Sequence, residues 1–557
     1  MIQDSRFMLP FVGTFHSLGA RILRKEAHNL GRTQNYTIYD SDDSLQAIKR
    51  AMKNLDISVK DMGPTLFRYL ISKIKSDLVE PAEVAEGEKL RLLHAVYDEY
   101  EAELARSNAF DFDDLIEKPV RLWQEHSTLL KKYQTAFQYV LVDEFQDVNT
   151  AQYEFVRLLA REHKNINVVG DDAQSIYKFR GAEFRHFLNF EKDWPETRVV
   201  FLEENYRSTS PILTAANAVI AKNKMQKPKN LWTKKEGGAP VAVVEHEDEV
   251  AEAEWMASEI KNLKLKIENY STAVLYRTNA QSRAIEQALI ERDIPYQIFG
   301  SIRFYERKEV KDMVSCLRYA ANPKDAVSLE RMEKSFYVKP FRELRAELPQ
   351  KASELSPYEL IAYAIHTTNY FEYLKKNYPN AEERVENLNE LMGFAEQYSN
   401  LNEFLEKVTL LQSSDNENSR AVNQELGIRN KELGKVGGKE TTIHNSQFTV
   451  PNPVALMTVH IAKGLEFDKV FVAGCNEGLL PHQMSYKTPE EIEEERRLMY
   501  VAMTRAKSEL ALSFYHIGSR FLYEIPPELI EFSAKNSSIR NGKSELIDDE
   551  ERYISFD

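Results

Sequence analysis

Leu141-Val142-Asp143-Glu144-Phe145-Gln146-Asp147 is an apolar run that ends directly in two adjacent carboxylates. Strands of a parallel sheet read as continuous apolar runs, and the chemistry of such sheets lies just beyond their carboxyl ends. At that position Asp143 can hold Mg²⁺, directly or through water, and Glu144 can deprotonate a water molecule that attacks a nucleoside triphosphate. An acidic turn exposed to solvent is the alternative interpretation of the same pair.

Similar apolar runs elsewhere predict further strands of parallel sheets. They lie at residues 139–142, 166–169, 199–202, 272–276, 454–459 and 469–473. Apolar residues at helical spacing fill two blocks between these runs, residues 20–105 and 311–412. The clearest helical face comprises four residues that lie three or four positions apart: Leu93, Val96, Tyr100 and Leu104. This order predicts an α/β fold with two parallel-sheet domains, each interrupted by a mainly helical insertion.

The turn after the second predicted strand gathers an amide, two aromatic rings and two cations: Gln174, Tyr177, Lys178, Phe179 and Arg180. The Gln174 amide could sense the terminal phosphate of a nucleotide. Aromatic rings such as Tyr177 and Phe179 stack on unpaired bases of any sequence, while neighbouring cations meet the phosphate backbone. Packing of both rings in a protein core is the alternative.

The composition is that of a globular protein with several domains. At 557 residues the chain is too long for one hydrophobic core, and 43% hydrophobic with 29% charged residues excludes a disordered chain. No apolar run is long enough to span a bilayer, and the first residues lack the layout of a signal peptide. With only Cys316 and Cys475, neither a disulfide framework nor a zinc site is available, and a cytoplasmic location fits best. The net charge of −14 predicts that any nucleic-acid site is a local groove.

Together these segments resemble the motifs of UvrD-like helicases of superfamily one, the group that includes the UvrD, PcrA and Rep types. The matching segments, in the order and spacing of the family, are residues 14–17, 110–115, 141–147, 168–182, 202–209, 276–279, 304–309, 458–467 and 494–506. A set of motifs in a fixed order is far more specific than any single motif. The resemblance spans residues 12 to about 525. It implies an ATP-dependent DNA helicase that moves 3′ to 5′ on single-stranded DNA, or at its junction with duplex, in repair or replication.

The resemblance also implies a plan of two RecA-like motor domains that bind ATP and Mg²⁺ between them. The predicted boundaries are 1–19 for a partial first motor domain, 20–105 for a helical insertion, 106–203 for the rest of the first motor, 204–310 for the second motor, 311–452 for a second helical insertion that ends in a polar loop, 453–527 for the rest of the second motor, and 528–557 for a polar tail. The tail is a candidate site for protein partners, with a disordered terminus as the alternative.

By the same resemblance, five residues form the catalytic set: Asp143, Glu144, Gln174, Arg207 and Arg505. Asp143 would hold Mg²⁺, Glu144 would act as the base, and the two arginines would reach the γ-phosphate from the second motor. Tyr206 would stack on adenine, Glu466 would accept a hydrogen bond from the ribose, and Gly464 would line the nucleotide site. The implied contacts to single-stranded DNA are Thr14, His16, Tyr177, Phe179, Arg180, Thr458 and His460. For a threonine or histidine at a strand end, a structural hydrogen bond is the alternative.

The sequence departs from this family because it contains no Gly-x-x-x-x-Gly-Lys-Thr segment, whose backbone amides and lysine cradle the β and γ phosphates. Gly542-Lys543-Ser544 is no substitute, since Ser537 stands where the pattern needs glycine. We therefore expect an N-terminally truncated chain with an incomplete first motor domain, and poor ATP hydrolysis by this polypeptide alone. The alternative is a catalytically inactive scaffold that binds DNA or a partner. No cluster of carboxylates and lysine follows residue 525, which disfavours a helicase joined to a nuclease.

Two further differences concern DNA binding. Phe179 stands where the family commonly has tryptophan, so stacking would continue with a smaller ring. In the second insertion, residues 336–342 replace a Gly-Ile-Gly hairpin that touches duplex DNA in relatives. We therefore do not expect this insertion to bind duplex.

Overall fold

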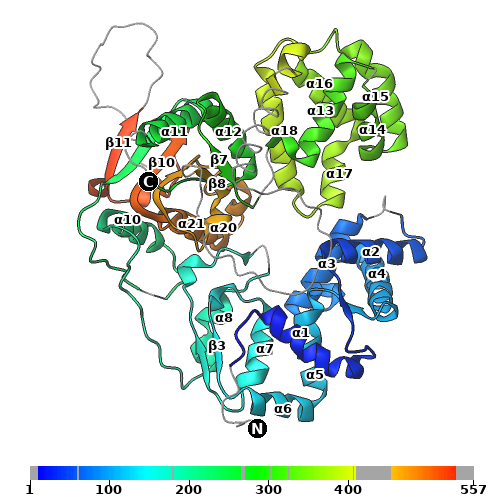
Figure 1. Ribbon diagram of the computed structural model, residues 1–557, viewed down its shortest axis with the longest axis vertical. Helices are drawn as coiled ribbons and strands as arrows, with labels where there is room; N and C mark the ends of the chain where they lie inside the picture. Colours follow the sequence, from blue (N-terminus) through cyan, green and yellow to red (C-terminus); the bar gives the residue numbers. More distant parts are fainter. Residues whose placement is uncertain are drawn as a thin grey trace, which may run out of the picture.

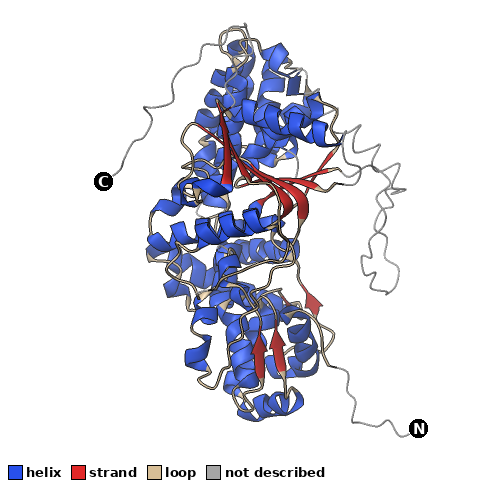
Figure 2. Ribbon diagram, turned by 90° about the vertical axis from the view of Figure 1, so that its left-hand side faces the viewer, coloured by secondary structure: helices blue, strands red, loops and turns tan. Residues whose placement is uncertain are grey.

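A computed structural model of the chain describes residues 10–58, 62–178, 181–227, 229–264, 270–300, 304–323, 325–405, 407–408 and 453–534. In the view of Figure 1, one α/β domain lies at the bottom and the other at the upper left, and a group of helices stands to the right of each. Figure 2 shows the larger sheet between its helices and the two short strands of the smaller sheet below it. This is the α/β class predicted, with one large parallel sheet and many helices.

The larger sheet has seven strands, all parallel to their neighbours. In spatial order they are β11 (Ile530–Ala534), β5 (Val241–His246), β10 (Ala506–Tyr515), β9 (Phe467–Val472), β6 (Thr272–Tyr276), β8 (Val454–Thr458) and β7 (Tyr296–Ile298). The strands predicted at 272–276, 454–459 and 469–473 are therefore confirmed. The helices that flank the sheet are α10 (Ser210–Ile220), α11 (Glu249–Lys264), α12 (Ser282–Glu291), α20 (Val459–Ala462) and α21 (Pro489–Met503).

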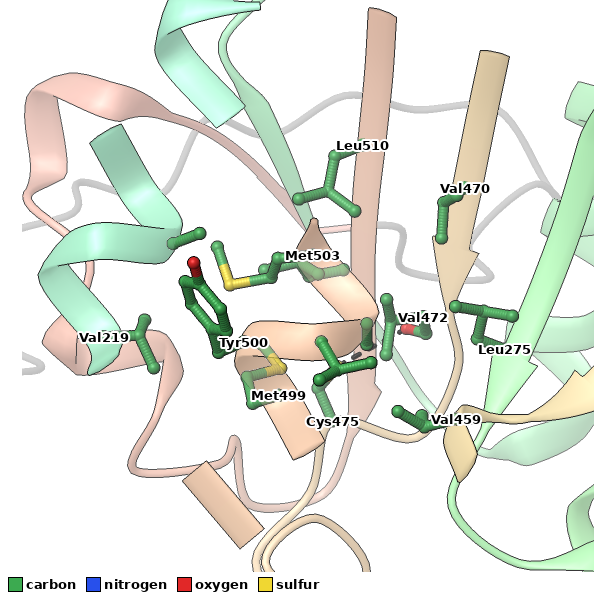
Figure 3. Packing of buried hydrophobic residues seen from close by; sticks show 14 of the residues in the cluster. Val219, Leu275, Val459, Val470, Val472, Cys475, Met499, Tyr500, Met503 and Leu510 are labelled. Atoms are coloured by element: carbon green, nitrogen blue, oxygen red, sulfur yellow. Dashed lines mark hydrogen bonds between the residues drawn. The ribbon is translucent and has the colours of Figure 1, made fainter. Parts of the chain in front are cut away.

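Both faces of this sheet are buried, which explains why its strands read as unbroken apolar runs. Val470 and Val472 of β9 belong to a hydrophobic cluster with α10 and α21, whereas Phe471 belongs to a second cluster with α11 and α12. Figure 3 shows Met499 and Tyr500 of α21 within the first cluster, with β9 on one side and α10 on the other. The carboxyl ends of the strands are thus fixed by packing on two sides.

The polar tail predicted for residues 528–557 is wrong at its start. Residues 530–534 form β11, which pairs in parallel with β5 from Ile530↔Val241 to Ala534↔Glu245. The polar and charged residues of this stretch suit an edge strand, where one side of the backbone has no partner strand among the described residues. The rest of the predicted tail, residues 535–557, lies outside the described residues.

The smaller sheet consists of β3 (Val140–Val142) and β4 (Ile166–Val168), paired in parallel. The strands predicted at 139–142 and 166–169 are thus confirmed. The surrounding helices are α1 (Phe15–Glu26), α5 (Asp114–Glu125), α6 (Ser127–Ala136), α7 (Thr150–Ala160), α8 (Arg185–Leu188) and α9 (Phe190–Asp193). Within the described part of the chain, no third strand joins this sheet.

The strand predicted at 199–202 does not form. All four of its residues are exposed, Leu202 to 80%, and Leu141 of β3 is likewise 76% exposed. An apolar run becomes a strand only if a neighbouring strand accepts its backbone hydrogen bonds. Among the described residues no such neighbour exists for 199–202. This segment therefore has the sequence pattern of a strand but does not form one.

The two helical insertions have their own hydrophobic cores. The first contains α2 (Ser41–Asn54), α3 (Pro64–Asp77) and α4 (Gly87–Arg106), and the two-residue strands β1 (Thr37–Ile38) and β2 (Ala109–Phe110) close it. The second contains α13 (Lys308–Ala321), α14 (Ala326–Ser335), α15 (Val338–Lys351), α16 (Pro357–Thr368), α17 (Tyr370–Asn377) and α18 (Ala381–Glu396). Residues 336–342 join α14 to α15 and begin the latter. The predicted polar loop at 413–452 lies outside the described residues.

Candidate nucleotide and DNA site

The adjacent carboxylates lie at the carboxyl end of β3, where both are exposed. Glu144 has a left-handed backbone (φ 50°, ψ 39°), which is rare for a residue with a side chain and is characteristic of functional turns. Its amide donates to Asp143 Oδ1 at 2.9 Å. Gln146 Nε2 donates to Glu144 Oε2 at 2.6 Å, so a buried amide fixes the direction of the candidate base.

Gln146 also ties this turn to residues 171–177, which we call the coupling loop. Its Oε1 accepts from the Asp171 amide at 2.9 Å, and its carbonyl accepts from Ser175 Oγ at 3.2 Å. Within the loop, the Gln174 side chain donates to Asp171 Oδ2 at 2.8 Å. The candidate phosphate sensor and the candidate base therefore share one hydrogen-bonded network.

The coupling loop follows a strand of the smaller sheet but packs on the other domain. Ala173 and Ile176 are fully buried in the same hydrophobic cluster as α10 and α21. Arg497 Nε of α21 donates to the Ser175 carbonyl at 2.8 Å, and Lys229 forms ion pairs with Asp171 and Asp172. The segment that carries Gln174 is thus anchored to the second domain.

The two candidate arginine fingers lie together in the second domain. Arg207 Nε donates to Glu466 Oε2 at 2.9 Å, while the buried Arg505 donates to the carbonyls of Val501 and Leu465, each at 3.1 Å. Burial, followed by the neighbouring Arg207 charge, lowers the pKa of Arg505 to about 10. Two cations held this closely gain from an approaching anion, as the γ-phosphate role requires.

The candidate adenosine contacts surround the same place. Hydrogen bonds from Lys507 and Arg207 lower the pKa of Glu466 to about 2, so its carboxylate is ionised and can accept from a ribose hydroxyl. Tyr206 is 75% exposed, and the amide of the preceding residue, Asn205, donates to the carbonyl of Trp232, whose side chain is also exposed. Gly464 has φ +84°, a conformation that a side chain would strain although nothing else occupies the space.

The predicted DNA contacts fall into two groups. Thr14 caps α1, since its Oγ1 accepts from the Ser17 amide at 3.2 Å, and His16 stacks on the exposed Phe112 ring at 4.0 Å. Tyr177 Oη donates to the His460 carbonyl at 2.9 Å, and Thr458 ends β8 just before α20. Tyr177 and His460 are thus brought together across the two domains. Phe179 and Arg180 lie outside the described residues.

Comparisons with known proteins agree with this arrangement. The model of the UvrD/REP helicase N-terminal domain matches residues 2–195, and that of the UvrD-like helicase C-terminal domain matches residues 200–355 and 334–516. The chain belongs to the UvrD-like helicase family. The ATP-dependent DNA helicases PcrA of Bacillus subtilis strain 168 and Staphylococcus aureus strain Mu50 are each 36% identical to it, over 94% of this chain and 76% of each relative. Among solved structures, the C-terminal domain of a possible DNA helicase from Lactobacillus covers 59% of this chain at 14% identity with a TM-score of 0.25, too low to support an inference.

UvrD-like helicases use ATP, and the acidic turn of this chain fits the accompanying Mg²⁺. Magnesium is usually held by one or two carboxylates together with phosphate oxygens and water, and Asp143 and Glu144 are exposed carboxylates at a strand end. The described residues contain no group of three His, Cys, Asp or Glu side chains suited to an all-protein metal site, which this mode of binding does not need. No helix in the described part of the chain is long and apolar enough to cross a membrane.

Four residues of this UvrD-like site were not predicted: Gln146, Trp232, Arg497 and Lys463, which pairs with Asp147 and donates to the Gln174 carbonyl. Gln146, Lys463 and Arg497 lie inside the quoted family motifs, so their segments were identified but their contacts were not. Their contacts to Asp171, Gln174 and Ser175 span 25 to 322 positions in sequence, and no local spacing reveals such pairs. Trp232 had no sequence signal beyond being one of four tryptophans.

Proposed function

We propose that this UvrD-like chain is the motor of an ATP-dependent helicase that moves 3′ to 5′ along single-stranded DNA in repair or replication. The observation that carries the proposal is the coupling loop. It links the acidic turn of the first domain, through Gln146, to the second domain that supplies Arg207 and Arg505. A helicase needs such a link, because it converts hydrolysis in one place into movement in another.

The proposed chemistry follows from the positions of the charged groups. Glu144, oriented by Gln146, takes a proton from the water that attacks the γ-phosphate. Mg²⁺ held by Asp143 would neutralise charge on the phosphate oxygens. Arg207 and Arg505 stabilise the charge that spreads over the γ-phosphoryl group, and they do so only when the second domain is close.

The DNA side of the proposal rests on residues at the junction of the two domains. Tyr177 and His460 share a hydrogen bond, and each lies within three residues of a side chain that we assign to nucleotide chemistry or its support, Gln174 and Lys463. Single-stranded DNA binds to sites where aromatic rings stack on its bases and other groups contact its phosphate backbone. Single-stranded DNA bound at this junction would therefore contact Tyr177, a residue of the coupling loop, so a shift of the DNA would act on the loop directly.

The sequence contains no Gly-x-x-x-x-Gly-Lys-Thr, and we propose that this polypeptide alone hydrolyses ATP poorly. The amides and lysine of that segment are the main cradle of the β and γ phosphates in P-loop enzymes. Removing electrostatic contacts of this kind costs on the order of several kcal/mol of transition-state stabilisation. A protein used only as a DNA-binding or partner-binding scaffold is the second candidate function, favoured by this one feature.

Strand-separation assays test the direction of movement. We would place before this chain an N-terminal extension that carries a Gly-x-x-x-x-Gly-Lys-Thr segment, and we call the product the joined chain. It is expected to unwind a duplex with a 3′ single-stranded tail and to leave a duplex with a 5′ tail intact, with Glu144→Gln as the inactive control. Unwinding from the 5′ tail would overturn the proposed polarity, and DNA binding without any unwinding would favour the scaffold.

A further inference from the structure

We propose that Lys463 is a positioning residue that connects DNA bound at the domain junction to the acidic turn of the nucleotide site. This inference rests on the proposed function. Lys463 follows α20 in the second domain, and its side chain is only 7% exposed. All of its polar partners come from the first domain: the carboxylates of Asp147 and Glu144 and the carbonyl of Gln174.

The contacts place one cation among three parts of the nucleotide site. Lys463 Nζ pairs closely with Asp147 Oδ2, donates to the Gln174 carbonyl at 2.6 Å, and lies 3.9 Å from Glu144 Oε2. Asp147 is largely buried, and this burial raises the pKa of its carboxyl while the lysine acts in the opposite direction. Removing the lysine would leave a buried carboxylate without its charged partner and the backbone of the phosphate sensor without its donor.

The same lysine also contacts the DNA side of the junction. Its ammonium lies 5.1 Å from the centre of the Tyr177 ring, and Tyr177 Oη donates to the carbonyl of His460. His460 lies within α20, a single helical turn, and Lys463 is the residue that directly follows it, so the two move as a unit. A base that displaces Tyr177 or His460 would therefore shift the cation that faces Glu144 and Gln174.

A purely structural ion pair is the competing explanation, and the chain offers a matched control for it. Lys469 of β9 is nearly as buried as Lys463, at 13% exposed, and pairs with Glu509 of β10 at 3.0 Å. That pair joins two strands of one domain and touches none of the proposed site residues. Loss of Lys469 should cost stability of the sheet without changing DNA binding.

The test measures the affinity of this chain for a fluorescent oligo-dT strand by anisotropy, which needs no ATP hydrolysis. We expect Lys463→Met to weaken binding about tenfold and Lys463→Arg to restore most of it. Lys469→Met should lower the melting temperature about as much as Lys463→Met does, but should leave the affinity for oligo-dT unchanged. Tyr177→Phe should also weaken oligo-dT binding. In a chain that already carries Lys463→Met it should cause little further loss of affinity, because both residues act through the same contacts. In a chain that carries Lys469→Met it should cause its full loss of affinity.

Asp147→Asn probes the same ion pair from the first domain and serves if Lys463→Met fails to fold. It should weaken oligo-dT binding as Lys463→Met does. A wild-type chain that binds no oligo-dT would overturn the proposed function itself. A wild-type chain that binds, with Lys463→Met and Asp147→Asn both behaving like Lys469→Met, would overturn this inference alone.

Discussion

Single carboxyl groups in the two α/β domains lie in opposite electrostatic environments. Glu144 is exposed and strained, with its carboxylate held by one amide, as a base that must meet a water molecule requires. Glu252 of α11 is the opposite case, because it is fully buried and accepts from the Gly474 amide at 2.9 Å. Burial raises the pKa of Glu252 to about 7. One carboxyl is arranged for chemistry and the other for packing.

Glu252 should make stability depend on pH. Its carboxyl keeps a proton up to about pH 7 in the folded chain but only to about 4.5, its ordinary pKa, in the unfolded chain. The free energy of unfolding should therefore fall as pH rises from about 4.5 to 7, by roughly 3 kcal/mol in total. Glu252→Gln, which keeps an acceptor for Gly474, should remove this part of the slope. Thermal unfolding of the wild-type chain and of Glu252→Gln at pH 5 and pH 8 measures this contribution. If the two chains differ in melting temperature by the same amount at both pH values, Glu252 is not the source of the pH dependence.

At the scale of elements, a buried lysine joins the first helical insertion to the first motor domain. Lys75 of α3 pairs with Glu101 of α4 at 2.6 Å, with Asp111 at 2.7 Å, and with Asp114 of α5 at 2.8 Å. Its side chain has no exposed surface. Lys75, together with Lys118, which also pairs with Glu101 and Asp114, thus compensates carboxylates that apolar packing alone would leave buried and charged.

Lys75→Met should destabilise the chain strongly. Removing one partner of a buried ionic cluster typically costs about 3–5 kcal/mol, because the remaining charges stay buried. Lys73→Met on the exposed side of the same helix is the control and should change little. Urea unfolding followed by circular dichroism gives both values. Equal midpoints for the two variants would show that the cluster contributes no net stability.

Elements with a strong local period were predicted well, and those that depend on a neighbour were not. Leu93, Val96, Tyr100 and Leu104 were predicted as one helical face, and all four are buried on α4. The run 199–202 had an equally clear strand pattern but lacks a partner among the described residues, while β11, which lies in the stretch predicted as a polar tail, has a partner and pairs. Strand formation is decided by the adjacent backbone, which sequence periodicity does not contain.

For the whole molecule, the motifs located the site but not the way in which its two halves connect. The candidate residues were named from segments that a family motif identifies, and the structure brings Tyr177 to His460 and the coupling loop to α21. The connecting contacts of Gln146, Lys463 and Arg497 are long-range pairs, so they required coordinates. The sequence therefore predicted what each half of the site contains, and the structure added how one half can act on the other.

The central claim is that this chain carries hydrolytic and DNA-coupling residues of a UvrD-like motor, and that efficient ATP hydrolysis needs a Gly-x-x-x-x-Gly-Lys-Thr segment that its sequence does not contain. ATP hydrolysis stimulated by single-stranded DNA tests it most directly, measured on this chain alone, on the joined chain, and on the Glu144→Gln form of each. We predict that this chain alone turns over no faster than its Glu144→Gln form, and that the joined chain shows DNA-stimulated turnover that Glu144→Gln lowers about a hundredfold or more. A joined chain that folds and binds DNA but hydrolyses no ATP, or turnover that is indifferent to Glu144, would contradict the claim.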